Sequence, residues 1–160
     1  MNEDEMSGPA DEEDAFDDPA YADDLEDHAS HNLQALVAAT MAFLGERQIP
    51  TGAWTTFLGE RFARDWETDE RLDPEAFLDG MLINLQTLGA VAVETDFTSR
   101  PVTATLTGFP DPEICAAFDV PVATVASYLD TASAAAARHG LGWSWRLDGE
   151  RLVVSVAGTS

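Results

Sequence analysis

The chain has 160 residues, 45% of them hydrophobic, and 30 acidic side chains against eight basic ones give it a formal net charge of −22. This length predicts a single domain. No apolar run approaches the roughly 18 residues that a membrane-spanning helix needs, and the N-terminus lacks the basic, apolar pattern of a signal peptide. The sequence therefore predicts a cytoplasmic protein with no membrane partner.

The basic residues are all arginines, and the chain contains no lysine. In dilute buffer such a charge makes the compact chain repel itself, whereas molar salt shortens the screening length to roughly 3 Å. This composition predicts a protein of a salt-loving organism, such as a haloarchaeon, that is stabilised by concentrated salt. The alternative is an acidic protein of a GC-rich mesophile, in which codon usage explains the arginine and alanine content.

Residues 1–31 hold 13 acidic side chains and no basic one. A stretch with so few apolar residues buries too little surface to offset the entropy of ordering it, so we predict a disordered acidic tail. It would act as a solubilising extension or as an interaction tail for a basic partner. Residues 32–160 are predicted to form the single folded domain.

Three helices are predicted in the first half of that domain. After Asn32, one apolar stripe recurs at helical spacing and comprises Leu33, Leu36, Val37, Met41 and Leu44. After Pro50, a second apolar face comprises Trp54, Phe57, Leu58, Phe62 and Trp66. The third helix has the clearest boundaries: Asp73 as N-cap, Pro74 in the first turn and Gly89 just past the end.

The pattern then changes to strands. Ala90–Glu94 and the alternating segment Val102–Leu106 are predicted strands. Asp111 and Pro112 open a brief helix, and a long helix follows from about Pro121 to His139. The chain closes with a hairpin from Trp143 to Val156, turning at Asp148-Gly149 as a type I′ pair.

These elements predict an α+β fold. A helical layer, made of about three N-terminal helices plus one long C-terminal helix, packs on a small, mainly antiparallel sheet.

Few residues have the pattern of a catalytic or metal site. The lone cysteine, Cys115, has no histidine nearby in sequence and is interpreted as a buried structural thiol. His139 ends the long helix, where it is interpreted as a capping residue. The three histidines show no zinc-type spacing with Cys115. We therefore expect no enzymatic activity, no metal and no cofactor.

The aromatic side chains are the best candidates for ligand binding. Between the helices and the sheet they could line a pocket for an apolar small molecule. This candidate set comprises Trp54, Phe57, Phe62, Trp66, Phe77, Trp143 and Trp145. The alternative is that they fill the core, because packing alone accounts for two tryptophans on an alternating strand.

The order of elements resembles that of the 4-vinyl reductase domain. The resemblance covers about residues 33–156. It rests on Phe57-Leu58-Gly59-Glu60, on Phe77–Gly89 running into Val91 and Val93, on strand 102–106, on the helix after Pro121 and on the closing hairpin. It implies a small-molecule-binding or sensory domain with an apolar pocket, forming a homodimer.

The sequence departs from that family in its cysteines. Such domains usually carry them at the start of the long helix and in the final hairpin. Here those regions hold Ala123 and a cysteine-free stretch from Trp143 to Val156. The departure puts in doubt any ligand or metal role that depends on cysteine.

A second reading of residues 111–156 is a winged-helix transcriptional regulator. In it, 114–118 and 121–139 form the helix pair and the hairpin forms the wing. DNA contact normally needs arginine or lysine along the recognition helix, which here offers only Arg138, at its far end. Nucleic acid is therefore the less favoured partner.

Overall fold

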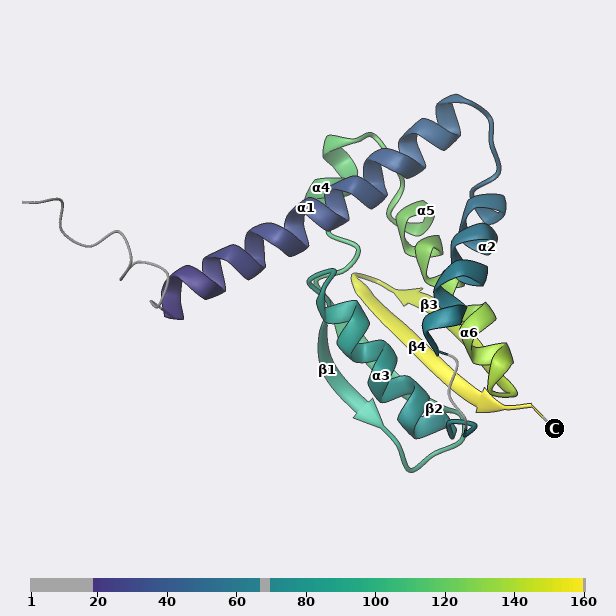
Figure 1. Ribbon diagram of the computed structural model, residues 1–160. Coiled ribbons are helices and arrows are strands. Elements are labelled where there is room, and N and C mark those ends of the chain that lie inside the picture. Colours follow the sequence, from purple (N-terminus) through teal and green to yellow (C-terminus); the bar gives the residue numbers. More distant parts are fainter. Residues whose placement is uncertain (1–18, 67–69, 160) are drawn as a thin grey trace, which may run out of the picture.

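The computed structural model of the protein describes residues 19–66 and 70–159. The first half consists of α1 (Pro19–Glu46), α2 (Thr51–Phe62), the 3-10 helix η2 (Ala63–Trp66) and α3 (Pro74–Gln86). Strands β1 (Val91–Asp96) and β2 (Val102–Thr107) follow, and then α4 (Pro112–Ala117), α5 (Val122–Ala126), the 3-10 helix η3 (Ser127–Thr131) and α6 (Ala132–Arg138). The hairpin of β3 (Leu141–Asp148) and β4 (Arg151–Gly158) ends the fold, so the predicted α+β class is confirmed (Figure 1).

The sheet has four antiparallel strands in the order β1-β2-β4-β3. On one face, side chains of β2 lie beside side chains of β4 in matched pairs, and all are buried: Val102 with Val156, Ala104 with Val154, and Leu106 with Leu152. Helix α3 packs against β2 and β4, and α6 packs against β3. The opposite face is polar, and on it the hydroxyls of Ser144 and Ser155 are 2.8 Å apart. Because only one face is apolar, the helices gather on that face.

The boundaries predicted for the third helix are confirmed. Asp73 adopts an extended conformation and its carboxylate accepts a hydrogen bond from the amide of Ala76, as an N-cap does. Pro74 occupies the first turn, where its missing N–H costs nothing. Gly89 follows the helix with φ at +75°, which a side chain would disfavour.

The closing hairpin is confirmed, but its turn is one residue later than predicted. Asp148 pairs with Arg151, so the loop residues are Gly149 and Glu150. Of these, Gly149 alone has a positive φ, at 63°. A glycine with positive φ at the first loop position is typical of a type II′ turn rather than type I′.

Helix α1 begins earlier than the sequence pattern indicated. Residues 19–31, predicted as part of the disordered tail, form its first turns. Alanine, leucine and glutamate supply helix propensity in this segment. Residues 1–18 of the predicted tail lie outside the described residues. The N-terminal half of α1 extends away from the sheet (Figure 1).

The apolar stripe of α1 is narrower than predicted. Val37, Met41 and Leu44 are buried, but Leu36 is 63% exposed, and Leu33 is partly exposed. The buried polar residue Gln34 completes the inner face. Its side-chain amide donates to the carbonyl oxygen of Gly108 at 2.8 Å and its carbonyl accepts from the amide of Asp111 at 2.9 Å. These bonds tie α1 to the turn before α4.

The face that α2 buries is different from the predicted aromatic face. Its buried residues are Thr55 and Gly59, followed by Ala63 in η2, whereas Phe57 is 53% exposed. Small side chains at this spacing let α2 approach η3 and α6 closely. A Cβ atom on Gly59 would lie 2.6 Å from the carbonyl oxygen of Thr131. Close backbone contact, not aromatic burial, decides how α2 is oriented.

The single long C-terminal helix is a wrong prediction, and so is the helix count that depended on it. Residues 122–138 form α5, η3 and α6 in succession, with the middle segment in the tighter 3-10 form. The hydroxyl of Ser127 donates to the carbonyl oxygen of Thr124 at 2.6 Å, which competes with the α-helical pattern at this point. The close approach of Gly59 to Thr131 constrains the next turn.

Candidate functional site

A cavity of about 290 Å³ lies between η2, α3, η3 and α6, with Leu33 of α1 at one end. Cavities that hold small ligands in proteins begin near this size, and an apolar cavity of about 150 Å³ binds benzene. The space is therefore sufficient for a molecule of roughly two such rings.

The inner surface of the cavity is apolar. It is formed by buried side chains from α3, the turn that follows it, η3 and α6, namely Met81, Leu85, Leu88, Leu129, Ala132 and Ala135. The alanines of α6 leave room that larger side chains would fill. An apolar group that enters the cavity therefore leaves water for a mainly apolar surface, in which Thr131 is a buried polar side chain.

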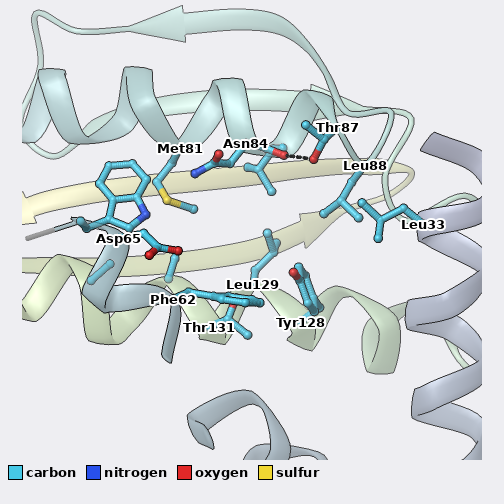
Figure 2. A pocket seen from close by; sticks show the side chains of 14 residues that line it. Leu33, Phe62, Asp65, Met81, Asn84, Thr87, Leu88, Tyr128, Leu129 and Thr131 are labelled. Carbon is cyan, nitrogen blue, oxygen red and sulfur yellow. Dashed lines mark hydrogen bonds between the residues drawn. The ribbon is translucent and has the colours of Figure 1, made fainter. Parts of the chain in front are cut away.

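Polar groups lie around the same cavity. Figure 2 shows Asp65, Asn84, Thr87 and Thr131 among the side chains that line it. The Thr87 hydroxyl donates to the backbone carbonyl oxygen of Asn84 at 2.6 Å, so its lone pairs can still accept. Asp65, Asn84 and Thr87 are solvent-exposed, which puts the polar groups where water reaches the cavity. The arrangement fits a molecule with an apolar body and a polar end.

Trp66 forms one aromatic wall and is held at both its ring and its backbone. Its ring centroid is 5.0 Å from that of Phe77, and a Cβ atom on Gly80 would lie 2.9 Å from the indole. Its carbonyl oxygen is 2.9 Å from Nε2 of His139. Gly80 therefore makes space for the indole, and His139 fixes the end of η2.

His139 links the two sides of the segment that joins η2 to α3. The amide of Leu72 donates to Nδ1 at 3.2 Å, so Nδ1 is unprotonated and Nε2 carries the proton that is donated to Trp66. The side chain is buried. It follows α6 as predicted, but it binds this segment rather than the carbonyls of its own helix.

Tyr128 forms the wall at the other end of the cavity, near Leu33 and Leu88 (Figure 2). Trp54 and Phe109 support its ring, with centroids 6.1 Å and 6.4 Å away. Burial raises the pKa of the Tyr128 hydroxyl above its usual value. The hydroxyl therefore stays protonated at neutral pH and can donate a hydrogen bond.

Of the seven aromatic residues predicted to bind a ligand, Phe62 and Trp66 line this cavity. Trp54 contacts Tyr128 from outside the lining, and Phe77 is fully buried in the core. Phe57 faces solvent, with the guanidinium of Arg61 4.9 Å above its ring. The structure thus divides the predicted set between wall, core and surface.

The two strand tryptophans anchor the sheet to η3. The indole N–H of Trp143 donates to the carbonyl oxygen of Leu129 at 2.8 Å, and that of Trp145 donates to the carboxylate of Asp130 at 2.7 Å. Both indoles thereby help to hold the 3-10 segment that carries Tyr128. Their geometry favours a packing role over direct ligand contact.

Sequence reasoning missed Asp65, Asn84 and Tyr128 as lining residues. They come from three elements distant in sequence, and none belongs to a recognisable motif. The aromatic content of the segment around Phe62 and Trp66 was the signal that did indicate a ligand site. The polar side chains beside it carried no comparable signal in a chain with 30 acidic residues.

The cysteine and the possible metal-ligating side chains were the other candidates for chemistry in the sequence. Cys115 is buried, as predicted, and burial together with the nearby charge of Asp111 raises the pKa of its thiol. Within residues 19–66 and 70–159, no group of three or more histidine, cysteine, aspartate or glutamate side chains is placed to hold a metal ion.

Comparisons with known proteins identify no relative: no protein-family model, no curated protein and no solved structure matches the chain. Among the helices of the described residues, none is both long enough and apolar enough to cross a membrane.

Proposed function

We propose that this protein is a non-enzymatic binding module for a small, mainly apolar molecule, which it holds in the cavity between η2, α3, η3 and α6. The observation that carries the proposal is an apolar interior of about 290 Å³ with polar side chains at its exposed edge. Binding sites for small molecules commonly combine these two features.

The aromatic walls support a sensory role for the same cavity. Trp66 belongs to a short 3-10 helix, and Tyr128 belongs to another. The 3-10 helix with Trp66 directly follows α2, and the 3-10 helix with Tyr128 is hydrogen-bonded to Trp143 and Trp145. A bound molecule that displaced either ring would therefore shift α2 or these two strand tryptophans. This expectation agrees with the resemblance to 4-vinyl reductase domains, which stays a prediction, as does the homodimer that it implies.

The winged-helix alternative has less support. Helix α2 packs over η3 and α6, the segment that would have to enter a DNA groove. The exposed side chains of 122–138 are those of Ala123, Asp130, Ser133, Ala137 and Arg138. A single arginine at the far end offers little to a phosphate backbone.

The proposal is tested by titrating the full chain with 2-phenylethanol in molar KCl while following tryptophan fluorescence and melting temperature. Saturable changes in both signals are expected. The variant Ala135→Phe fills the cavity from α6 and should abolish them, whereas Ala137→Phe, on an exposed position of the same helix, should retain them.

Circular dichroism checks that Ala135→Phe is folded. A second variant, Asn84→Trp, blocks the cavity from an exposed position, where a large side chain is tolerated. If the wild-type chain shows no saturable response, or if both blocked variants respond like the wild type, the proposal is wrong.

A further inference from the structure

The formal charge among the described residues that line the cavity is negative. Asp65 is the ionised side chain among the described lining residues, and no arginine or histidine accompanies it there. No described basic group forms an ion pair or hydrogen bond with its carboxylate. An anionic headgroup would therefore find a like charge and no counter-charge in this lining.

A second feature points the same way. The C-terminal turn of α3, with Asn84 and Thr87, lines the cavity, and no basic residue lies in that turn. The C-terminal end of a helix carries a partial negative charge that favours cations. The carbonyl oxygens of Asn84, Leu85 and Gln86 already accept backbone amides, so this helix end adds a small preference for positive charge to that of the Asp65 carboxylate.

The neighbouring groups suit an ammonium group in particular. Figure 2 shows Asp65 extending toward the space beneath Met81, and Trp66 follows Asp65 directly in η2. A carboxylate accepts strong hydrogen bonds from an ammonium group, and an indole face attracts cations. Further along, Thr87 offers acceptor lone pairs, and the remaining lining accepts an apolar body.

We propose that the cavity binds a small organic amine, with an apolar or aromatic body of one or two rings in the interior and its ammonium group paired with Asp65. This inference rests on the proposed function and narrows it to one class of ligand. The same negative charge disfavours carboxylic acids of the same size.

Three probes of matched size test the inference: 2-phenylethylammonium, 2-phenylethanol and 3-phenylpropionate. Titrations are made in molar KCl, because screening at roughly 3 Å suppresses the general attraction of cations by the net charge of −22 and leaves contact pairing. The wild-type chain should bind the ammonium probe about threefold more tightly than the alcohol, as one ion pair with an exposed carboxylate allows. The carboxylate should bind more weakly than the alcohol.

Two variants test whether Asp65 causes the preference for the ammonium probe. Asp65→Asn keeps the shape of the side chain and removes its charge, so the affinities of this variant for the ammonium probe and for the alcohol should become equal. Asp79→Asn removes an exposed charge from α3 outside the cavity and should keep the wild-type preference.

The outcomes separate this inference from the proposed function. Alcohol binding without a preference for the ammonium probe, or a preference that persists in Asp65→Asn, overturns the amine assignment while the cavity still binds. Failure of all three probes to bind overturns both.

Discussion

Nε2 of His139 lies 2.9 Å from the carbonyl oxygen of Trp66, joining the end of α6 to the end of η2 across 73 residues of sequence. The other ring nitrogen accepts from the amide of Leu72. One buried imidazole therefore forms hydrogen bonds with both Trp66 and Leu72, the residues on either side of the connection between η2 and α3. The position of the Trp66 wall depends on this side chain.

Replacing that imidazole should destabilise the protein. His139→Ala leaves the partly buried Trp66 carbonyl and Leu72 amide without their hydrogen-bond partner and should lower the free energy of unfolding by about 1–3 kcal/mol. Urea unfolding in molar KCl measures this. His31→Ala, at an exposed position of α1, is the control and should change it by less than about 0.5 kcal/mol. Equal stability of the two variants would contradict the bridging role.

Two glycines of α2 should respond in opposite directions to alanine. At Gly59 the new methyl group meets the carbonyl oxygen of Thr131 at 2.6 Å, so α2 must shift, at a cost of about 1–3 kcal/mol. At Gly52 nothing lies within 4 Å, so the better helix propensity of alanine should add up to about 1 kcal/mol. Thermal unfolding distinguishes them, and a neutral Gly59→Ala would mean that α2 and η3 are not in close contact.

The thiol of Cys115 should be unreactive in the folded protein. Burial, reinforced by Asp111, raises its pKa, so at neutral pH less thiolate is present than in the unfolded chain. Its reaction with Ellman's reagent at pH 7 should be slow, and it should become fast when urea unfolds the protein. Fast modification of the folded chain would show that the thiol is accessible and ionised.

Salt should stabilise the protein. The net charge of −22 produces repulsion in the compact state that molar salt screens. The melting temperature should therefore rise steeply as KCl increases from millimolar to molar concentration, whereas a matched concentration of glycerol should not reproduce this rise. A melting temperature that does not depend on salt would refute the interpretation of the composition as halophilic.

Local signals in the sequence predicted the local structure. The cap at Asp73, the proline at 74 and the glycine at 89 act within one turn of chain, so the boundaries of α3 follow from neighbouring residues alone. The closing hairpin follows in the same way from strand alternation around a glycine, although the turn type depended on which loop position that glycine occupies.

Features that depend on distant contacts were not predictable in this way. The inward face of α2 is set by the approach of Gly59 to Thr131, 72 residues later. The aromatic residues of the same helix had instead predicted that their own face is buried. The division of 122–138 into α5, η3 and α6 has a local cause in Ser127 and a distant one in α2.

The candidate site was predicted only in part, for the same reason. Phe62 and Trp66 were identified because aromatic side chains concentrate around them. Asp65 and Tyr128 line one cavity only when η2, α3 and η3 pack around it in the folded chain. No periodicity within a single segment carries that information.

The central claim is that the cavity beside α3 receives a small molecule. It is tested most directly by amide chemical-shift mapping of the full chain, titrated with 2-phenylethanol in molar KCl. We predict saturable shifts that concentrate on Asn84, Thr87, Leu129 and Thr131 and leave Thr103 and Ser155, on the outer face of the sheet, unchanged. Absence of shifts, or shifts centred on that outer face, would contradict the account.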